Sequence, residues 1–368
     1  MFLDIYKKVI GIFDKGYNQV KCHTIKDKNY FEKKLIGEGG FGYVYLVEDS
    51  NCQNFAIKII NITSEKQLNL VKKELRIWDE ISNKCEYAIK LIDYEIIKVN
   101  DNKEEMTTSC ISIAKCLMEY SSEGTLLDYI NKTIINEEEV IDIIGKICEF
   151  LNIFHDLGFT HRDIKPENIL KFEDKLKICD FGSCTDEVFI YEKLGKKEMN
   201  KKKDEFEKIS TFNYRSPEML DKFCEFDCDN KVDIWMLGCL TYLCSFRKHP
   251  FENCQKLGII NCAYSFDEES INSSKVKFSE RFKDLIRVML NPNPKKRPSA
   301  KILLKVVKNW GNNVSIKLPN ECKIIKSKQI TDNKDNSNEF NNTIETLENI
   351  RYPISIDQEV VVDDFDFS

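Results

Sequence analysis

The chain has 368 residues, which corresponds to two or three folding units at about 150 residues per domain. Hydrophobic residues make up 42% and aromatic residues 11%, which excludes a wholly disordered or collagen-like chain. The 55 Lys and Arg against 61 Asp and Glu give a net charge of −6, so no global basic field attracts nucleic acid. We therefore expect no nucleic-acid partner, and any phosphate-binding site must be local.

The cysteines and the hydropathy pattern indicate the compartment. The 15 Cys are an odd number and include no CxxC pair, which argues against a disulfide scaffold. Cys224 and Cys228 come closest to a metal-ligand spacing, but no His lies near them to complete a zinc site. No apolar run reaches the about 18 residues of a transmembrane helix. We therefore expect a cytoplasmic protein without a transmembrane segment.

The hydrophobic pattern divides the chain into three regions. From about 28 to 120, short β-branched and aromatic runs broken by one helical stretch predict a mostly antiparallel sheet. From about 125 to 310, apolar residues recur at helical spacing, as Val140 and Ile144 do. Beyond about 312 the chain is polar with few aromatic residues, which predicts a disordered tail.

A glycine-rich segment lies in the predicted sheet. A GxGxxG pattern is weak by itself, because dinucleotide-binding folds share it, but in those folds the last glycine opens a helix. Here strand composition follows Gly42, so the segment joins two strands, and its amides can lie over a triphosphate. An ordinary hairpin turn is the alternative. The segment comprises Ile36, Gly37, Glu38, Gly39, Gly40, Phe41, Gly42, Tyr43 and Val44.

The next strand and helix supply a candidate ion pair. Ala56 and Lys58 lie two residues apart in a predicted strand, so they share one face, where Ala56 can cover a flat base and Lys58 can reach phosphates. A surface lysine is the alternative. The helical stretch that follows begins with a capping box from Ser64 to Gln67, and its apolar stripe contains Glu74. A carboxylate on a buried face needs a cation, and Lys58 is the natural partner unless Glu74 lies at the helix edge.

The strongest motif is HRDIKPENIL at 161–170, followed by DFG at 180–182. Asp163 can accept the proton of a substrate hydroxyl, and Lys165 can neutralise the charge that moves with a phosphoryl group. Asn168 and Asp180 offer the oxygen ligands that Mg²⁺ prefers. From the glycine-rich segment onward, the motifs and their order resemble the eukaryotic protein kinases. A pseudokinase scaffold is the alternative of a different class.

The resemblance implies a fold and a set of boundaries. We expect a bilobal α+β protein kinase fold, with a small antiparallel β N-lobe that carries one helix and a larger helical C-lobe. The kinase domain is expected over 28–310, with the N-lobe over 28–121 and the C-lobe over 122–310. An N-terminal extension over 1–27 and a polar tail over 311–368 flank this domain. ATP and Mg²⁺ are the implied cofactors.

Residue roles follow from the same resemblance. Met118 is the implied gatekeeper, and Glu119, Tyr120 and Ser121 form the hinge whose backbone binds adenine. Ile36, Val44, Ala56 and Leu170 would sandwich the base. The implied catalytic residues are Asp163, Lys165, Lys58 and Glu74, the implied metal ligands are Asn168 and Asp180, and Glu167 belongs to the nucleotide-binding set.

The kinase resemblance also implies residues for structural support and specificity. It implies a buried pair between Glu218 and Arg297. Asp233 begins an apolar helix, so its carboxylate must be satisfied by donors, and the resemblance assigns these to amides of the HRD loop. Lys165 and Thr211 match serine/threonine kinases. Ser210, directly before Thr211, is the candidate regulatory phosphorylation site, with Arg162 as the receptor of a phosphate, and Thr185 and Tyr191 are the other hydroxyls to be checked for phosphate. A segment in which none of these hydroxyls is modified is the alternative.

Several strings are similar to the Numb-associated kinase family, among them GEGGFGYVYLVED and DIWMLGCLTYLCSFRKHPF. This resemblance implies phosphorylation of clathrin-adaptor subunits and a peripheral location at endocytic membranes. It also predicts an extra helix over Met219–Asn230. The lysine-rich activation segment KKEMNKKKDEFEK and a long loop at 100–108 depart from the family, and a serine/threonine kinase of another group is a further alternative.

The last residues of the chain suggest a partner. Phe365 and Phe367 lie between aspartates, so they can dock in a pocket with a basic rim, as acidic Phe motifs do on adaptor appendage domains. A solvated acidic segment without a partner is the alternative. We expect the chain to be a monomer.

Overall fold

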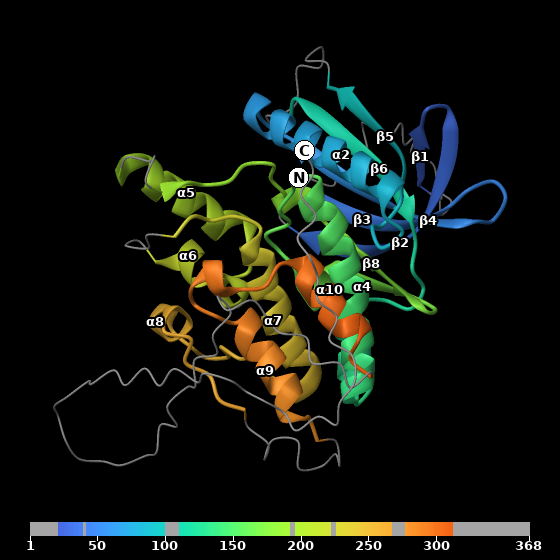
Figure 1. The fold of residues 1–368 in the computed structure, drawn as a ribbon. Helices are drawn as coiled ribbons and strands as arrows, with labels where there is room; N and C mark the ends of the chain where they lie inside the picture. The colour runs from blue at the N-terminus through green and yellow to red at the C-terminus, as the bar shows by residue number, and fades with distance from the viewer. Residues whose placement is uncertain are drawn as a thin grey trace, which may run out of the picture. The chain divides into compact units, whose positions relative to one another are not determined.

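The computed structural model describes residues 21–39, 42–99, 110–191, 196–221, 226–266 and 277–311. The chain forms two compact units. Unit 1 comprises the chain up to Thr125 together with Asn168–Cys184, and unit 2 comprises Leu126–Glu167 and the chain from Thr185 onward. Figure 1 shows the elements of both units in chain order by colour.

Unit 1 is built around a six-stranded antiparallel sheet in the order β1-β2-β3-β4-β6-β5, which confirms the predicted sheet. The first strand, β1, lies inside the range that we predicted as an N-terminal extension. The strands are β1 (Cys22–Ile25), β2 (Lys28–Gly39), β3 (Gly42–Glu48), β4 (Asn54–Ile62), β5 (Leu91–Lys98) and β6 (Ser112–Glu119).

A single long helix, α2 (Glu65–Lys84), packs on this sheet against β4 and β5. Its N-terminus begins as the capping box predicts, because the Ser64 side chain accepts from Gln67 N at 3.2 Å. The reciprocal bond differs: Gln67 Oε1 accepts from Thr63 N at 2.9 Å. The buried face of α2 contains the apolar residues Leu68, Val71, Leu75, Trp78 and Ile81, and also Glu74.

A short hairpin completes unit 1. It consists of β7 (Ile169–Phe172) and β8 (Lys175–Ile178), and the turn η2 (Phe181–Ser183) follows it. Ile178 joins the hairpin to the segment after α2, since its N–H donates to Tyr87 O at 2.8 Å and its carbonyl accepts from Ile89 N at 2.9 Å. These backbone bonds place the DFG segment in the same unit as the sheet.

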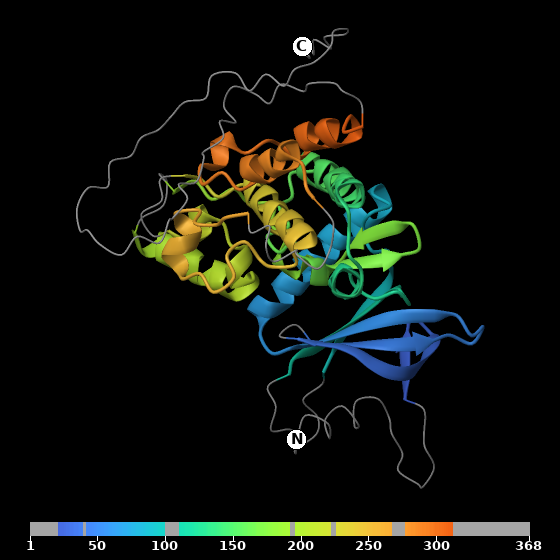
Figure 2. The same ribbon diagram turned by 90° about the horizontal axis from the view of Figure 1, so that it is seen from below.

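Unit 2 is helical around α7, whose residues are almost all buried. Helices α4 and α9 pack on α7, and α10 packs on α4 (Figure 2). One sheet-based unit and one helical unit confirm the predicted α+β class. The helices are α3 (Leu126–Lys132), α4 (Glu137–Asp156), α5 (Lys196–Ile209), α6 (Pro217–Leu220), α7 (Lys231–Phe246), α8 (Lys256–Ile260), α9 (Glu280–Met289) and α10 (Ala300–Lys308). The short turns η1 (Pro166–Asn168), η4 (Phe212–Tyr214) and η6 (Pro294–Lys296) complete the described elements.

The predicted extra helix over Met219–Asn230 is wrong in its extent. Helix α6 ends at Leu220, and residues 226–230 are bends, turns and a bridge. Backbone bonds between Cys228 and Phe189 in both directions, at 3.0 and 3.1 Å, hold this part in an extended pairing that excludes a helix. Gly40, Phe41, the loop at 100–108 and the tail beyond residue 311 lie outside the described residues. Among the described helices, none combines the length and apolar character needed to span a bilayer.

Candidate active site

Lys58 in unit 1 is the centre of a buried ionic cluster. Its Nζ lies 2.8 Å from Glu74 Oε1 on α2 and 3.2 Å from Asp180 Oδ1 after β8. The side chains of Lys58 and Glu74 are only 11% and 7% exposed. Burial by itself lowers the pKa of Lys58, but the carboxylates of Glu74 and Asp180 outweigh it, so this pKa lies above its usual value. The ammonium therefore stays charged.

The surrounding fold positions each member of this cluster. The predicted pair forms because Glu74 lies on the buried face of α2, which packs on the strand that carries Lys58. Phe181 packs flat on Trp78 of α2 with ring centroids 5.9 Å apart, and this contact fixes the residue next to Asp180. Asp180 itself has a φ of 64°, a left-handed conformation that is strained for a non-glycine residue.

The glycine-rich segment is part of the β2–β3 pair. Gly42 has a φ of +127°, and a Cβ at this position would collide with the carbonyl oxygen of Ile59, so only glycine fits. Val44 is opposite Gly37 on β2 and opposite Lys58 on β4, so this strand pair borders the ionic cluster. Ile36 lies in a register shift between Leu35 and Gly37 and is exposed. Glu38, Gly39 and Tyr43 belong to the same pair.

The end of β6 carries the predicted hinge. Met118 is buried and lies opposite Ala56 of β4. The Glu119 carboxylate accepts from Lys177 Nζ at 2.6 Å and from Lys90 N at 2.6 Å, so its side chain is held by hydrogen bonds within unit 1. Ser121 Oγ donates to the carbonyl of Lys171 on β7. Leu170 of β7 forms an antiparallel bridge with Thr125, so the predicted hinge lies next to the β7–β8 hairpin. Tyr120 is the residue between Glu119 and Ser121.

Asn168 is buried, and its backbone pairs with the residue that precedes Asp180. Its carbonyl accepts from Cys179 N at 2.9 Å, and Cys179 directly precedes Asp180. The two residues of the predicted metal set therefore flank the paired ends of the β7–β8 hairpin, Asn168 before β7 and Asp180 after β8. Among the described residues no cluster of three His, Cys, Asp or Glu could hold a metal alone. Such a pair fits Mg²⁺, which keeps waters and phosphate oxygens in its coordination shell.

Asp163 in unit 2 lies in a second polar cluster. Its Oδ2 lies 2.8 Å from Lys165 Nζ, and its Oδ1 accepts from Thr211 Oγ1 at 3.2 Å. Lys165 Nζ also donates to Thr211 Oγ1 at 2.9 Å, so the three side chains form a closed ring of contacts. Sequence reasoning used Thr211 only for specificity, because the bond that joins it to the loop spans 48 residues. Glu167 lies in the turn η1 of the same loop.

Asp233 of α7 accepts hydrogen bonds from backbone amides of the HRD motif at 161–163, as predicted. Asp233 accepts from His161 N at 2.9 Å, from Arg162 N at 2.8 Å and from His155 Nε2 at 2.9 Å. Burial by itself raises the pKa of Asp233, but these hydrogen bonds and the nearby histidines outweigh it and lower the pKa below its usual range. The carboxylate therefore stays ionised and supports Arg162, which has a strained φ of 68°.

The predicted pair between Glu218 and Arg297 is also present in unit 2. Arg297 donates to both carboxylate oxygens of Glu218, at 2.6 and 2.8 Å, and both side chains are 0% exposed. The guanidinium lies over the ring of Trp235 at 5.0 Å, and its Nε donates to Asn291 O at 2.7 Å. Since all its donors are used, this buried pair is a fixed part of the fold.

Helix α5, which lies between the DFG motif at 180–182 and Glu218, was not predicted from the sequence. Glu and Lys residues dominate this segment, and their i,i+3 pairing, as in Lys202 and Glu205, was the signal that favours a helix. The three hydroxyls considered for phosphorylation, Ser210, Thr185 and Tyr191, are all buried around it. Glu205 of α5 lies 3.4 Å from Arg162, at the place where the sequence predicts a phosphate.

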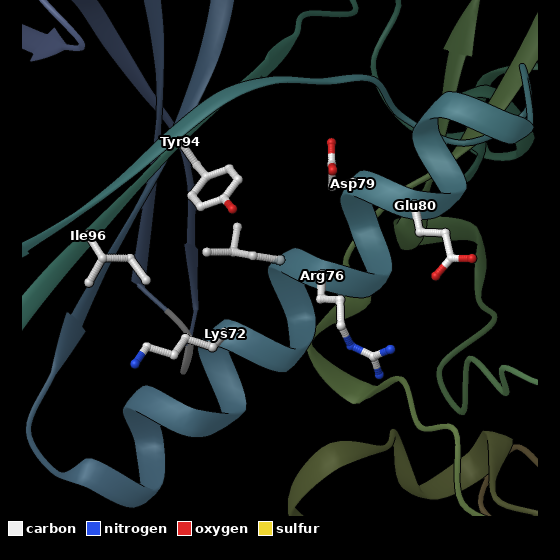
Figure 3. Close-up of a pocket in the computed structure, with 7 residues that line it drawn as sticks. Lys72, Arg76, Asp79, Glu80, Tyr94 and Ile96 are labelled. Atoms are coloured by element: carbon white, nitrogen blue, oxygen red, sulfur yellow. The ribbon is translucent and has the colours of Figure 1, made fainter.

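A groove of about 510 Å³ lies between α2 and β5, and Figure 3 shows Tyr94 of β5 pointing toward the helix there. Its lining mixes charged and apolar side chains and includes neither Lys58 nor Asp180. The lining residues are Lys72, Leu75, Arg76, Asp79, Glu80, Tyr94 and Ile96.

Comparisons with known proteins agree with this geometry. The protein kinase domain family matches residues 30–307. A probable serine/threonine-protein kinase of Dictyostelium discoideum is 35% identical over 294 residues, 77% of this chain and 24% of that protein. A second such kinase from this organism is 33% identical over 292 residues, 77% of this chain and 34% of that protein. Actin-regulating kinase PRK1 of Saccharomyces cerevisiae is 30% identical over 292 residues, 76% of this chain and 34% of that protein.

The chain thus spans between a quarter and a third of the length of these curated relatives. The family model nevertheless covers most of the chain, from the second strand of the sheet to α10. The chain therefore belongs to the protein kinase domain family.

Proposed function

We propose that the protein is a serine/threonine protein kinase that transfers the γ-phosphoryl group of ATP to protein hydroxyls. The observation that carries this proposal is the contact of Lys58 with both Glu74 and Asp180. This Lys–Glu pair and the DFG aspartate are the parts that phosphoryl transfer requires in protein kinases. A scaffold has no need for a buried lysine held charged between two carboxylates.

In the proposed reaction the residues of unit 1 bind the nucleotide. Lys58 would pair with its phosphates, held in place by Glu74, and the glycine-rich segment Ile36–Val44 would cover them with backbone amides. Asn168 and Asp180 would hold Mg²⁺, which supplies neutralising charge for the phosphate oxygens when bound. The remaining nucleotide-binding residues would contact the adenine: Ala56, Met118, Glu119, Tyr120, Ser121 and Leu170, with Glu167 in the adjoining loop.

The residues of unit 2 act on the acceptor. Asp163 would accept a hydrogen bond from the substrate hydroxyl and orient its oxygen for attack on the γ-phosphorus. Its bonds to Lys165 and Thr211 hold the carboxylate in one orientation. Lys165, with one donor on Asp163 and one on Thr211, would face the charge that moves with the phosphoryl group. The use of Thr211 in this ring supports serine and threonine as acceptors.

We further propose a role in endocytic trafficking. The similarity to actin-regulating kinases and the strings typical of the Numb-associated family support this placement. Clathrin-adaptor subunits are the proposed substrates, and the tail at Phe365 and Phe367 is the proposed contact with an appendage domain. A cytoplasmic location with peripheral attachment to endocytic membranes would follow, with the kinase domain of 28–310 acting as a monomer.

The test is transfer of labelled phosphate from ATP to a basic protein, followed by phosphoamino-acid analysis. We expect phosphoserine and phosphothreonine without phosphotyrosine. Asp163→Asn should keep nucleotide binding and lower turnover by about 10²- to 10⁴-fold. Asp174→Asn, in the β7–β8 turn, is the matched control and should behave as wild type. Nucleotide binding without any transfer by the wild-type protein would instead favour a pseudokinase scaffold.

A further inference from the structure

The guanidinium of Arg162 lies in a position that demands a counter-charge. Its side chain is only 6% exposed. Arg162 directly precedes Asp163 in the sequence, and its backbone N–H donates to Asp233. Burying a cation without an anion raises the free energy of the folded state. Arg162 also has a strained φ of 68°, so an unpaired charge would favour a change of its backbone conformation. The anion that pairs with Arg162 therefore influences the conformation of the catalytic loop.

Glu205 of α5 supplies an anion from within the chain. Its Oε1 lies 3.4 Å from Arg162 Nη1, and its other oxygen pairs with Lys202 at 3.3 Å. The Arg162 guanidinium also lies over the rings of Phe189 and Phe206, with distances of 5.8 and 6.0 Å to the centroids. Phe206 is fully buried and packs edge-to-face on Phe189, so apolar packing fixes the turn of α5 that carries Glu205.

The C-terminal end of α5 is anchored as well. Arg215 donates to the carbonyls of Glu207 at 2.9 Å and Ser210 at 2.8 Å, which satisfies carbonyl groups at the end of the helix. Thr211 follows at once and contacts Asp163 and Lys165. Contacts at Glu205 and Ser210 fix the C-terminal end of α5, and this end positions Thr211 beside Asp163.

We infer that Glu205 is a positioning residue for phosphoryl transfer, whose carboxylate neutralises Arg162 and orders the catalytic loop without phosphorylation of the activation segment. This inference rests on the proposed function and adds its mode of activation. Ser210, Thr185 and Tyr191 are buried, and each already donates or accepts hydrogen bonds through its side chain or backbone. A phosphate on any of them would have to displace packed structure, whereas Glu205 is in place in the unmodified chain.

The experiment uses the full chain after phosphatase treatment, with an intact mass that shows no phosphate. The unmodified wild-type protein should transfer phosphate at the rate of the untreated protein. Glu205→Gln should lower kcat by about tenfold while leaving the KM for ATP unchanged, since the ion pair that it removes lies beside Asp163. Asp204→Asn removes the same charge from the preceding, exposed position of α5 and should have no effect.

A double-mutant cycle separates positioning from mere helix stability. In an Arg162→Gln background, Glu205→Gln should cause no further loss, because its partner is already absent. A full tenfold loss in that background would overturn the inference, and so would wild-type kcat in Glu205→Gln. Should Glu205→Gln fail to fold, the phosphatase-treated wild type still decides: activity that appears only after phosphorylation contradicts a built-in carboxylate. Absence of transfer in every phosphorylation state would contradict the proposed function itself.

Discussion

Asp163 accepts two hydrogen bonds from Thr211, one from its backbone N–H at 3.3 Å and one from its hydroxyl at 3.2 Å. The two residues lie 48 positions apart, so these bonds tie the HRD motif at 161–163 to the segment that follows α5. Lys165 contacts both side chains, at 2.8 Å to Asp163 and 2.9 Å to Thr211. The candidate base and the segment expected to meet the substrate are thereby fixed to each other.

The hydroxyl of Thr211 gives the first prediction. Thr211→Val keeps the shape of the side chain but removes both hydroxyl bonds, so we expect kcat to fall by about tenfold because Asp163 is less well oriented. Thr211→Ser keeps the hydroxyl and should retain most of the activity. Steady-state kinetics of both variants are the measurement, and equal rates for the two would contradict a role for the hydroxyl.

The buried carboxylate of α2 gives the second. Glu74→Gln keeps the size of the side chain and leaves Asp180 as an acidic neighbour of Lys58. We expect lower activity with the fold intact, because Lys58 loses the anion that positions it for the nucleotide phosphates. Activity assays with thermal melting test this, and Glu80→Gln, which removes a charge paired with Lys84 on the same helix, is the control. A fully active Glu74→Gln would mean that the pair has no function here.

The third prediction concerns Ser210. The sequence suggests that a phosphate on Ser210 would raise activity, but its contacts in the structure predict that a negative charge there lowers activity. Its hydroxyl donates to Phe206 O at 2.6 Å and accepts from Arg215 Nε at 3.1 Å, at the end of α5. A negative group there should disrupt this end of the helix, so Ser210→Glu is expected to lower kcat. Ser210→Ala should stay close to wild type in the same assay. Activation by Ser210→Glu would instead support a stimulatory phosphate at this position.

The ion pair between Glu218 and Arg297 predicts a large effect on stability. Arg297→Met leaves a carboxylate buried without its cation and should cost about 3 to 5 kcal/mol in the free energy of unfolding. Denaturant unfolding measures this, and Lys295→Met at an exposed neighbouring position is the control. The double variant with Glu218→Gln should be more stable than Arg297→Met alone. A double variant that is less stable would contradict an uncompensated charge as the cause.

His249 predicts a pH dependence of stability. Burial lowers its pKa from 6.5 to about 4, so between these values the unfolded chain binds more protons than the folded one. The free energy of unfolding should therefore rise with pH across this window, and acidification from pH 6.5 to 4 should remove up to about 3 kcal/mol. The difference in unfolding free energy between wild type and His249→Asn, measured from pH 4 to 7, isolates this contribution. A difference that does not change with pH would refute it.

Local patterns were sufficient for much of the fold and for the site in outline. Short runs of β-branched and aromatic residues predicted the sheet, because such side chains favour the extended strand conformation. Glu74 was predicted to pair with Lys58 because a carboxylate on an apolar helix face has few other ways to be satisfied. The pair of Glu218 with Arg297 and the amide acceptor Asp233 came from the kinase resemblance, and the structure contains both.

Tertiary structure alone decided how the activation segment is arranged. In KKEMNKKKDEFEK only Met199 and Phe206 are apolar, and their spacing of seven places them on one helical face, but the sequence does not show what that face packs against. Phe206 packs against Phe189, and this contact accompanies the approach of Glu205 to Arg162 across 43 positions. The burial of Ser210 and the bond from Lys165 to Thr211 follow from the same docking. Sequence spacing determines which side chains share an element, but only packing between elements determines which charges meet.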